Sequence, residues 1–498
     1  MQFTSRSLVA MLSVAALAVG VSGCGNDAPS ESRVDATAYA DEIGQRLSAD
    51  AMMGHLTRLQ EIADQHDGNR AMGTPGYQAS VDYVLNLLRD KGFDAKTEEF
   101  EVRLPFAEEP DVTVAGSKVG AMGMSFTVGT GPQGVSGPLV AAPADDSPGC
   151  ADADYEGLPV QGAVVLVDRG TCQFGEKAGI AAKRGAVALL IADNEDRPVE
   201  EFGGTLGSGT TVKIPVLAIT EAEGARLRAN PGEATVKLTA GVNVEKTTNV
   251  IAQTTTGSTE NVVMVGAHLD SVPEGPGIND NGSGVAAVLE TALQMGSSPD
   301  VQNAVRFGFW GAEELGLRGS ADYVGRLDAE ALKDIALYLN FDMVGSPNPG
   351  YFTYDGNQSA PPAADGSVPR VPEGSAGIER MLVGYLDSAG KPAEDTSFDG
   401  RSDYDAFTQA GIPSGGLFSG AEGNMTAEQA ERWGGNADQP FDPNYHKATD
   451  TLDHIDRTAL EILGRGVGYS TAFYAQDISG RNGVPVREDR TRHAQSAS

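Results

Sequence analysis

A chain of 498 residues is too long for one compact hydrophobic core, so we expect two domains with accessory segments. The composition is that of a globular protein, with 40% hydrophobic and 21% charged residues, and 63 glycines indicate many turns and loops. The formal net charge of −33 argues against binding to nucleic acid or to an anionic lipid surface.

The N-terminus has the pattern of an export signal. Arg6 precedes a short apolar run that ends in Val21-Ser-Gly-Cys24. The run is too short to span a bilayer, and no later segment reaches that length. The tetrad resembles the bacterial lipobox, in which the cysteine is lipidated and becomes the mature N-terminus. We therefore predict a lipoprotein signal peptide at 1–23, lipidation of Cys24 and a flexible tether at 24–45. An ordinary secretory signal is the alternative.

The first folded segments are two helices and a strand. Apolar residues recur at helical spacing from Leu47 to Gln65 and from Pro75 to Lys91. Gly92 stops the second helix, and Phe93 to Val102 is typical of a strand. We assign residues 46–109 to the first part of the main domain.

Between 110 and 240 the chain changes character, because Gly, Pro, Ala and Val dominate and helical spacing nearly vanishes. One clear unit is a strand at 163–167, a helix at 174–184 and a second strand at 186–191. The segment Asp168-Arg-Gly-Thr-Cys-Gln-Phe-Gly-Glu-Lys-Ala178 resembles the protease-associated domain inserted into many secreted peptidases. That resemblance implies a β-rich insert without catalytic residues, which shapes access to the site or binds a protein partner that the sequence does not identify. A plain β-rich insert is the alternative.

The cysteine count agrees with an exported protein. If Cys24 is lipidated, Cys150 and Cys172 remain as an even pair in an oxidising compartment. We predict a disulfide between them, because a two-cysteine zinc site would need a nearby histidine.

From Thr248 onward strands and helices alternate regularly, which predicts an α/β fold with a mostly parallel twisted sheet and helices on both faces. The predicted strands lie at 262–266, 304–310 and 336–341, and the predicted helices at 284–295, 320–327 and 456–478. Residues 241–480 would complete the main domain, and the charged tail at 481–498 is predicted to be disordered.

Metal-type side chains follow the ends of these strands. His268, Glu314 and Asp342 each stand at such an end, where ligand sites of parallel sheets lie. With Asp280 and His446 they make two histidines and three carboxylates, a set that suits two zinc ions sharing one carboxylate. Singly each signal is weak, since a lone histidine is usually a core residue and Asp-Asn-Gly is usually a turn.

The local sequences around these residues are far more specific than the residues themselves. They are Gly266-Ala-His-Leu-Asp-Ser271, Asn279-Asp-Asn-Gly-Ser-Gly284, Gly311-Ala-Glu-Glu-Leu-Gly316, Asn340-Phe-Asp-Met343 and Tyr445-His-Lys-Ala-Thr-Asp450. With them, residues 46–104 and 247–475 closely resemble the secreted bacterial di-zinc aminopeptidases. The wider family includes glutamate carboxypeptidase and the transferrin receptor. The resemblance implies a zinc-exopeptidase fold that removes N-terminal amino acids from peptides.

The resemblance also implies a ligand set for two zinc ions per chain. His268 and Asp342 would hold one ion, Glu314 and His446 would hold the other, and Asp280 would bridge them. Carboxylates offset the charge of two dications, which histidines alone would not do.

Four further residues receive roles. Glu313 would act as general base on the bridging water and pass the proton to the leaving amine. Tyr445 would stabilise the oxyanion of the tetrahedral intermediate. Asp270 would accept the imidazole N–H of His268 and fix its tautomer. Arg401, in a segment that resembles the family, would bind substrate near its free amino end, with a structural salt bridge as the alternative.

Other functions remain open on the same site. A carboxypeptidase or dipeptidase could use it, although the dimerisation domain of the carboxypeptidase branch is not evident after residue 480. Glutaminyl cyclases share the fold with one zinc, and receptor-like relatives lack ligands, so a full set argues against both. The acidic composition is compatible with Ca²⁺, but no EF-hand loop is present. The sequence does not show which N-terminal side chain the enzyme prefers. We expect residues 415–422 to contribute to the pocket that binds this side chain.

Overall fold

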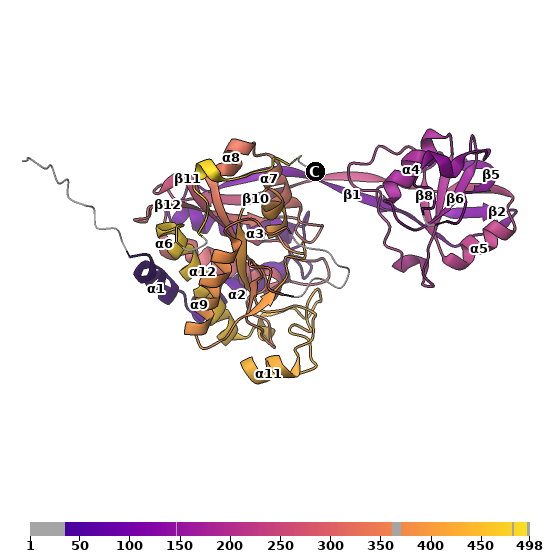
Figure 1. Ribbon diagram of the computed structural model, residues 1–498. Helices are drawn as coiled ribbons and strands as arrows, with labels where there is room; N and C mark the ends of the chain where they lie inside the picture. Colours follow the sequence, from indigo (N-terminus) through magenta and orange to yellow (C-terminus); the bar gives the residue numbers. More distant parts are fainter. Residues whose placement is uncertain (1–34, 146, 361–369, 481–482, 496–498) are drawn as a thin grey trace, which may run out of the picture.

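Two lobes joined by a long two-stranded ribbon make up the computed structural model of this chain (Figure 1). The structure describes residues 35–145, 147–360, 370–480 and 483–495. The ribbon consists of β1 (Lys96–Ala107) and β10 (Ala240–Gln253), and the whole of β1 pairs antiparallel with residues 240–251 of β10. The chain therefore leaves the first lobe along β1 and returns along β10. The predicted signal peptide and Cys24 lie outside the described residues.

The first lobe is built on an eight-stranded sheet in the order β1-β10-β12-β11-β13-β16-β14-β15. The central strands β12, β11, β13 and β16 run parallel, and antiparallel pairs occur at β1·β10, β10·β12 and β14·β16. The remaining strands are β11 (Ser258–His268), β12 (Asn303–Trp310), β13 (Ile335–Phe341), β14 (Phe352–Tyr354), β15 (Glu394–Thr396) and β16 (Ser414–Phe418).

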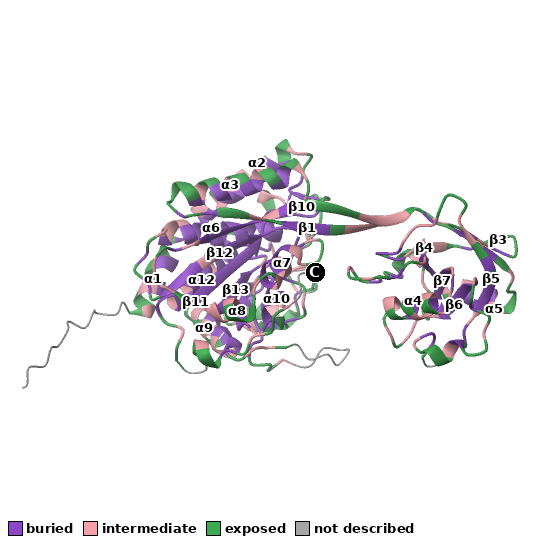
Figure 2. Cartoon of the chain, turned by 90° about the horizontal axis from the view of Figure 1, so that it is seen from above, coloured by how far each residue is buried: buried purple, intermediate pink, exposed green. Residues whose placement is uncertain are grey.

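Helices cover both faces of this sheet, which confirms the predicted fold class. The larger hydrophobic core unites one face with α1 (Ala36–Arg46), α2 (Ala49–Gln65), α3 (Pro75–Asp90), α6 (Gly284–Met295), α9 (Ser375–Ser388) and α12 (Arg457–Gln476). A second core packs the other face against α7 (Arg318–Gly325), α8 (Ala329–Asp334) and α10 (Tyr404–Gln409). The helix α11 (Ala427–Trp433) lies at the periphery. Figure 2 shows the central strands buried between these layers.

Polar caps explain why the helices begin where they do. The Ser48 side chain accepts a hydrogen bond from Ala51 N, and the Thr74 side chain accepts one from Tyr77 N, with Pro75 at the first helical position. Asp456 caps α12 in the same way. The helices predicted from apolar spacing are therefore present, with ends displaced by a few residues.

The predicted tether is wrong in its second half. Residues 36–46 form α1, which packs against α12, because Ala40 and Ile43 are buried there. Gly44 allows this contact, since a Cβ at that position would lie 3.2 Å from the Arg465 carbonyl oxygen. The periodicity of α1 is short and interrupted by polar residues, so burial rather than sequence pattern makes it a helix.

The predicted disorder of the tail is also wrong for residues 483–495. Arg490 is buried and donates hydrogen bonds to the carbonyl oxygens of Glu260 and Lys333. Arg492 donates to the carbonyl oxygens of Leu332 and Ile335. These two arginines hold the segment against the domain by donating to backbone carbonyl groups. The charged composition of the segment gives no sign of these contacts.

The second lobe has its own eight-stranded sheet, in the order β3-β2-β9-β5-β6-β7-β8-β4, with one hydrophobic core on each side. Its strands are β2 (Asp111–Val114), β3 (Ser117–Lys118), β4 (Ala121–Gly123), β5 (Val135–Ala141), β6 (Val164–Asp168), β7 (Ala188–Ala192), β8 (Val216–Ile219) and β9 (Glu233–Lys237). Its helices are α4 (Phe174–Lys183) and α5 (Glu221–Ala229). The predicted strand–helix–strand unit is β6-α4-β7.

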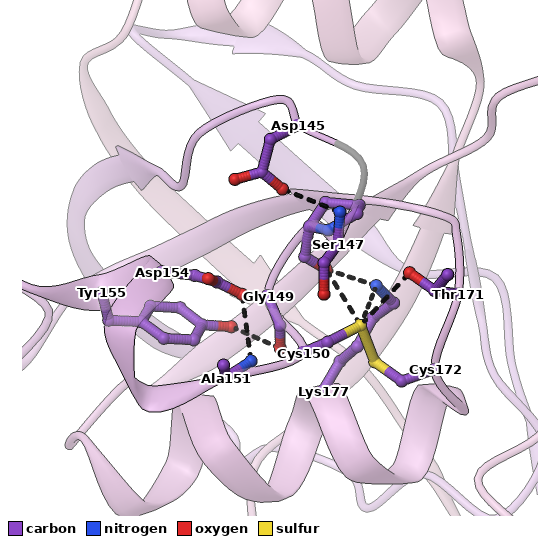
Figure 3. The surroundings of a disulfide bond; sticks show 11 residues. Asp145, Ser147, Gly149, Cys150, Ala151, Asp154, Tyr155, Thr171, Cys172 and Lys177 are labelled. Carbon is purple, nitrogen blue, oxygen red and sulfur yellow. Dashed lines mark hydrogen bonds between the residues drawn. A yellow bond between two sulfur atoms is a disulfide. The ribbon is translucent and has the colours of Figure 1, made fainter.

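Cys150 and Cys172 form the predicted disulfide in this lobe (Figure 3). Beside it, the buried Lys177 donates a hydrogen bond to the Pro148 carbonyl oxygen, and its Nζ lies 3.4 Å from Cys150 Sγ. The lysine ties the loop before Cys150 to α4, and the disulfide ties Cys150 to the segment just before that helix. No helix within the described parts of the chain is long and apolar enough to cross a membrane.

Candidate metal centre and active site

Three neighbouring parallel strands bring candidate ligands to one edge of the first sheet. β11 lies between β12 and β13 and runs parallel to both. His268 is the last residue of β11, Glu314 lies in the loop after β12, and Asp342 follows β13 directly. Because the carboxyl ends of parallel strands meet at the same edge, residues distant in sequence become neighbours there.

Asp280 and His446 reach the same edge from loops. Asp280 lies in the turn Ile278–Ser283 between β11 and α6, where Asp280 and Asn281 have non-helical backbone angles and their peptide bond is cis. Asp280 Oδ1 is 3.1 Å from His268 Nε2, and Asp280 Oδ2 is 3.2 Å from His446 Nε2. One carboxylate thus presents one oxygen to each histidine, which is the arrangement of a bridging ligand.

Each histidine has one further carboxylate beside it. Asp342 Oδ1 lies 3.4 Å from His268 Nε2, and Glu314 Oε2 lies 3.0 Å from His446 Nε2. Glu313 Oε2 stands 3.9 Å from His268 Nε2, farther than either. The closest contacts give two groups that share Asp280. The ligand atoms of His268, Glu313 and Asp342 also lie within 4.8 Å of one another, so Glu313 is near enough to compete as a ligand.

The chemistry of this donor set fits divalent cations. Glu314 Oε1 and Asp342 Oδ1 are buried and accept no hydrogen bond from the described residues. Burial, with the charge of Asp280, raises the pKa of Glu314 to about 7, and burial raises the pKa of Glu313 well above its usual range. Unpaired buried carboxylate oxygens are destabilising unless a cation meets them.

Asp270 has a different contact from the one predicted. The His268 ring Nδ1 lies 3.1 Å from the backbone carbonyl oxygen of Asp270, whereas the nearest Asp270 carboxylate oxygen is 3.7 Å away. The carboxylate instead accepts the backbone N–H groups of Glu313 and Glu314, at 3.1 and 3.3 Å. The backbone of Asp270 therefore orients the histidine, and its side chain orients the glutamate pair.

A cavity opens beside these residues. Met343, Tyr354, Phe418 and Ala421 are among its walls, and the last two belong to the region expected near the side-chain pocket. Arg401 is also in the lining.

Arg401 and Tyr445 are joined at the mouth of this cavity. Arg401 Nη2 donates to Tyr445 Oη at 3.3 Å, and Arg401 Nη1 pairs with Glu422 at 2.9 Å. The Tyr445 ring stacks on His446, with centroids 3.8 Å apart. Burial and the charge of Asp280 raise the pKa of Tyr445 above its ordinary value, so its hydroxyl stays protonated. The salt bridge expected as the alternative for Arg401 is therefore present, and because Arg401 also lines the cavity its role in substrate binding stays a prediction.

Two buried residues were not identified from the sequence. The Asp450 carboxylate accepts the backbone N–H groups of Asn279 and Asp280, at 2.8 and 3.0 Å. Arg70 lies wholly buried behind the same loop. Asp450 belongs to the segment around His446, so proximity to a ligand was an available signal. Arg70 had none, because it precedes that loop by about 200 residues in the chain.

Two histidines and several carboxylates, gathered at a sheet edge over a partly apolar cavity, are typical of metal-dependent hydrolases of the zinc-exopeptidase class. Residues 249–471 match the model of Peptidase family M28, and residues 135–227 match that of the PA domain. The probable lipoprotein aminopeptidase LpqL of Mycobacterium tuberculosis is 64% identical over 98% of both chains. The chain belongs to peptidase family M28.

Other relatives agree with this class. An aminopeptidase of Pseudomonas aeruginosa is 40% identical over 86% of this chain and 81% of its own. The solved aminopeptidase from Aneurinibacillus sp. strain AM-1 has a TM-score of 0.65 at 27% identity, covering 88% of this chain and 96% of that one. The zinc aminopeptidase of Bacillus subtilis has a TM-score of 0.54 at 27% identity, covering 88% and 97%. The predicted enzyme class and the inserted domain are confirmed, and zinc is the metal to which these relatives point.

Proposed function

We propose that this chain is an exported aminopeptidase with two zinc ions per chain, held as predicted by His268 and Asp342, by Glu314 and His446, and by the shared Asp280. The observation that supports the proposal is the placement of Asp280, whose two oxygens face one histidine each. Glu314 Oε1 and Asp342 Oδ1, which are buried and accept no hydrogen bond from the described residues, would supply further contacts to the two ions. Zinc bound there would polarise the peptide carbonyl and lower the pKa of a water molecule.

Glu313 is the proton carrier in this proposal. Its backbone is held by Asp270, and its carboxylate lies beside the ligands without making the shorter contacts of Asp342 or Glu314. A carboxylate at that place can take a proton from water and later pass it to the leaving amine. The side chain thus acts first as base and then as acid.

Tyr445 would stabilise the oxygen that gains charge when the peptide carbonyl is attacked, and Arg401 would bind the substrate near its free amino end. The Tyr445 hydroxyl accepts a hydrogen bond from Arg401 and lies at the cavity, so its own proton can be donated to that oxygen. The acidic cluster would also attract the free α-ammonium of a peptide. An acylated N-terminus has no such charge, and this difference favours N-terminal cleavage.

The remaining parts of the chain have supporting roles. We propose that residues 1–23 direct export and that Cys24 carries a lipid, so that the enzyme is tethered at the outer face of the cell membrane or is secreted. The tetrad at 21–24 and the relative named as a lipoprotein aminopeptidase support this. The ribbon and the second lobe would form a separate inserted domain between two parts of the catalytic domain.

The test uses protein that begins after Cys24. Leucyl-para-nitroanilide and its N-acetylated analogue would each be assayed with and without a chelator, followed by addition of zinc. We expect hydrolysis of the free-amine substrate alone, lost on chelation and recovered with zinc, and two zinc ions per chain by elemental analysis. Two bound zinc ions without hydrolysis would refute the aminopeptidase proposal and would favour carboxypeptidase or dipeptide substrates.

A further inference from the structure

Arg70 is fully buried beneath the loop that joins His268 to Asp280. Its Nε donates to the Pro276 carbonyl oxygen at 2.9 Å, and its Nη2 donates to the Gly277 carbonyl oxygen at 2.6 Å. Its Nη1 donates to the carbonyl oxygen of Leu269, the residue directly after His268. All three guanidinium nitrogens therefore hold the backbone of one loop, at both of its ends.

The backbone of Arg70 binds the same loop. Arg70 N donates to Ser271 Oγ at 2.9 Å, and Ser271 N donates to the Arg70 carbonyl oxygen at 3.3 Å. Gly277 has a φ of 62°, and a Cβ there would lie 2.4 Å from the Asp280 carbonyl oxygen and 3.2 Å from Arg70 Nη2. Only glycine lets the loop close this tightly, so the loop is shaped around the guanidinium.

The charge of Arg70 also matters, because its direct acceptors are neutral carbonyl groups. Burial lowers the pKa of Arg70 to about 10, and Asp270, Asp450, Asp280 and Glu314 oppose that shift from a distance. A buried cation of this kind is tolerated where carboxylates surround it. Arg70 is thus a fixed positive charge behind an acidic cluster that faces the cavity.

We propose that Arg70 is a positioning residue for the metal centre. Before any metal binds, it holds His268 and Asp280 in the positions from which they would bind the metal. The planar guanidinium fork spans three carbonyl groups at fixed angles, which a lysine ammonium cannot do. Its action passes through the backbone of the loop and not through contact with substrate. This inference rests on the proposed di-zinc site.

The test compares two buried arginines. Arg490 is also buried and also donates to backbone carbonyls, of Glu260 and Lys333, but near the beginning of β11 rather than at its end. Full-chain Arg70→Lys and Arg490→Lys would be stripped of metal and titrated with zinc against a chromophoric chelator. Absorption spectra of the cobalt-loaded forms and unfolding temperatures would be recorded alongside.

We expect Arg70→Lys to bind zinc about ten- to a hundredfold more weakly than the unaltered chain, with an altered cobalt spectrum. We expect Arg490→Lys to lower the unfolding temperature and leave both metal readouts unchanged. Unaltered zinc affinity and cobalt spectrum in folded Arg70→Lys would overturn the proposal and leave Arg70 a purely structural residue. If the unaltered chain itself bound no zinc, the proposed function would fail instead.

Discussion

Replacing Glu313 by Gln removes one carboxylate from the cavity and leaves the backbone contact of that residue intact. The contact is made by Glu313 N to the Asp270 carboxylate, so it survives the substitution. The side chain keeps its size and its buried position, and its Oε2 lies 3.9 Å from His268 Nε2. The change therefore isolates proton transfer from metal binding.

The expected loss follows from that isolation. General acid–base catalysis contributes roughly 10²- to 10⁴-fold to enzymatic rates, so we expect kcat to fall by about 10³-fold, or about 4 kcal/mol in the activation barrier. KM for leucyl-para-nitroanilide should change little, because the cavity walls are untouched. The assay combines steady-state kinetics with zinc analysis of the same preparation, and Glu314→Gln serves as the comparison that should lose metal.

Two results would refute this reasoning. Loss of one zinc ion from Glu313→Gln would make Glu313 a ligand, as its grouping with His268 and Asp342 allows. A fall in kcat of less than tenfold, with both ions retained, would show that a group other than Glu313 transfers the proton.

Three further predictions concern separate parts of the molecule. Tyr445→Phe should lower kcat about 10²-fold with little change in KM, and an effect on KM alone would remove Tyr445 from the oxyanion role. Replacing both Cys150 and Cys172 by Ser should destabilise the second lobe by about 3 kcal/mol in chemical denaturation, while hydrolysis of leucyl-para-nitroanilide stays unchanged. Glu290 has its pKa lowered by a 3.0 Å hydrogen bond from His55, so its stabilising effect is full above pH 4.5 and is lost as the pH falls through the lowered value. At pH 7 the free energy of unfolding of Glu290→Gln should therefore be about 2 kcal/mol lower than that of the unaltered chain, and the unfolding temperature should be lower too. The difference between the two proteins should narrow as the pH falls. A difference that does not change with pH would contradict the proposed link between Glu290 ionisation and stability.

Much of the architecture could be predicted from short-range sequence patterns. The alternation after Thr248 indicated the parallel sheet, and α6 has the bounds that its apolar spacing predicts, Gly284–Met295. The even pair of cysteines indicated the disulfide. These features depend on neighbouring residues or on simple counts, so they are visible in one sequence.

Long-range burial accounts for the errors. The helix at 36–46 exists because α12, more than 400 residues later, covers it. The segment at 483–495 is ordered because Arg490 and Arg492 find carbonyl oxygens on other elements. No local pattern reports a partner at that distance.

The sequence by itself determined the enzyme class, because five metal-type residues stand in specific local motifs. Only the tertiary structure decided how they meet: Asp280 faces both histidines, and Asp270 binds the glutamates through its side chain and His268 through its backbone. Arg70 likewise became visible only there. The physical reason is that hydrogen bonds and charges act over a few ångströms in space, and folding alone determines which distant residues come that close.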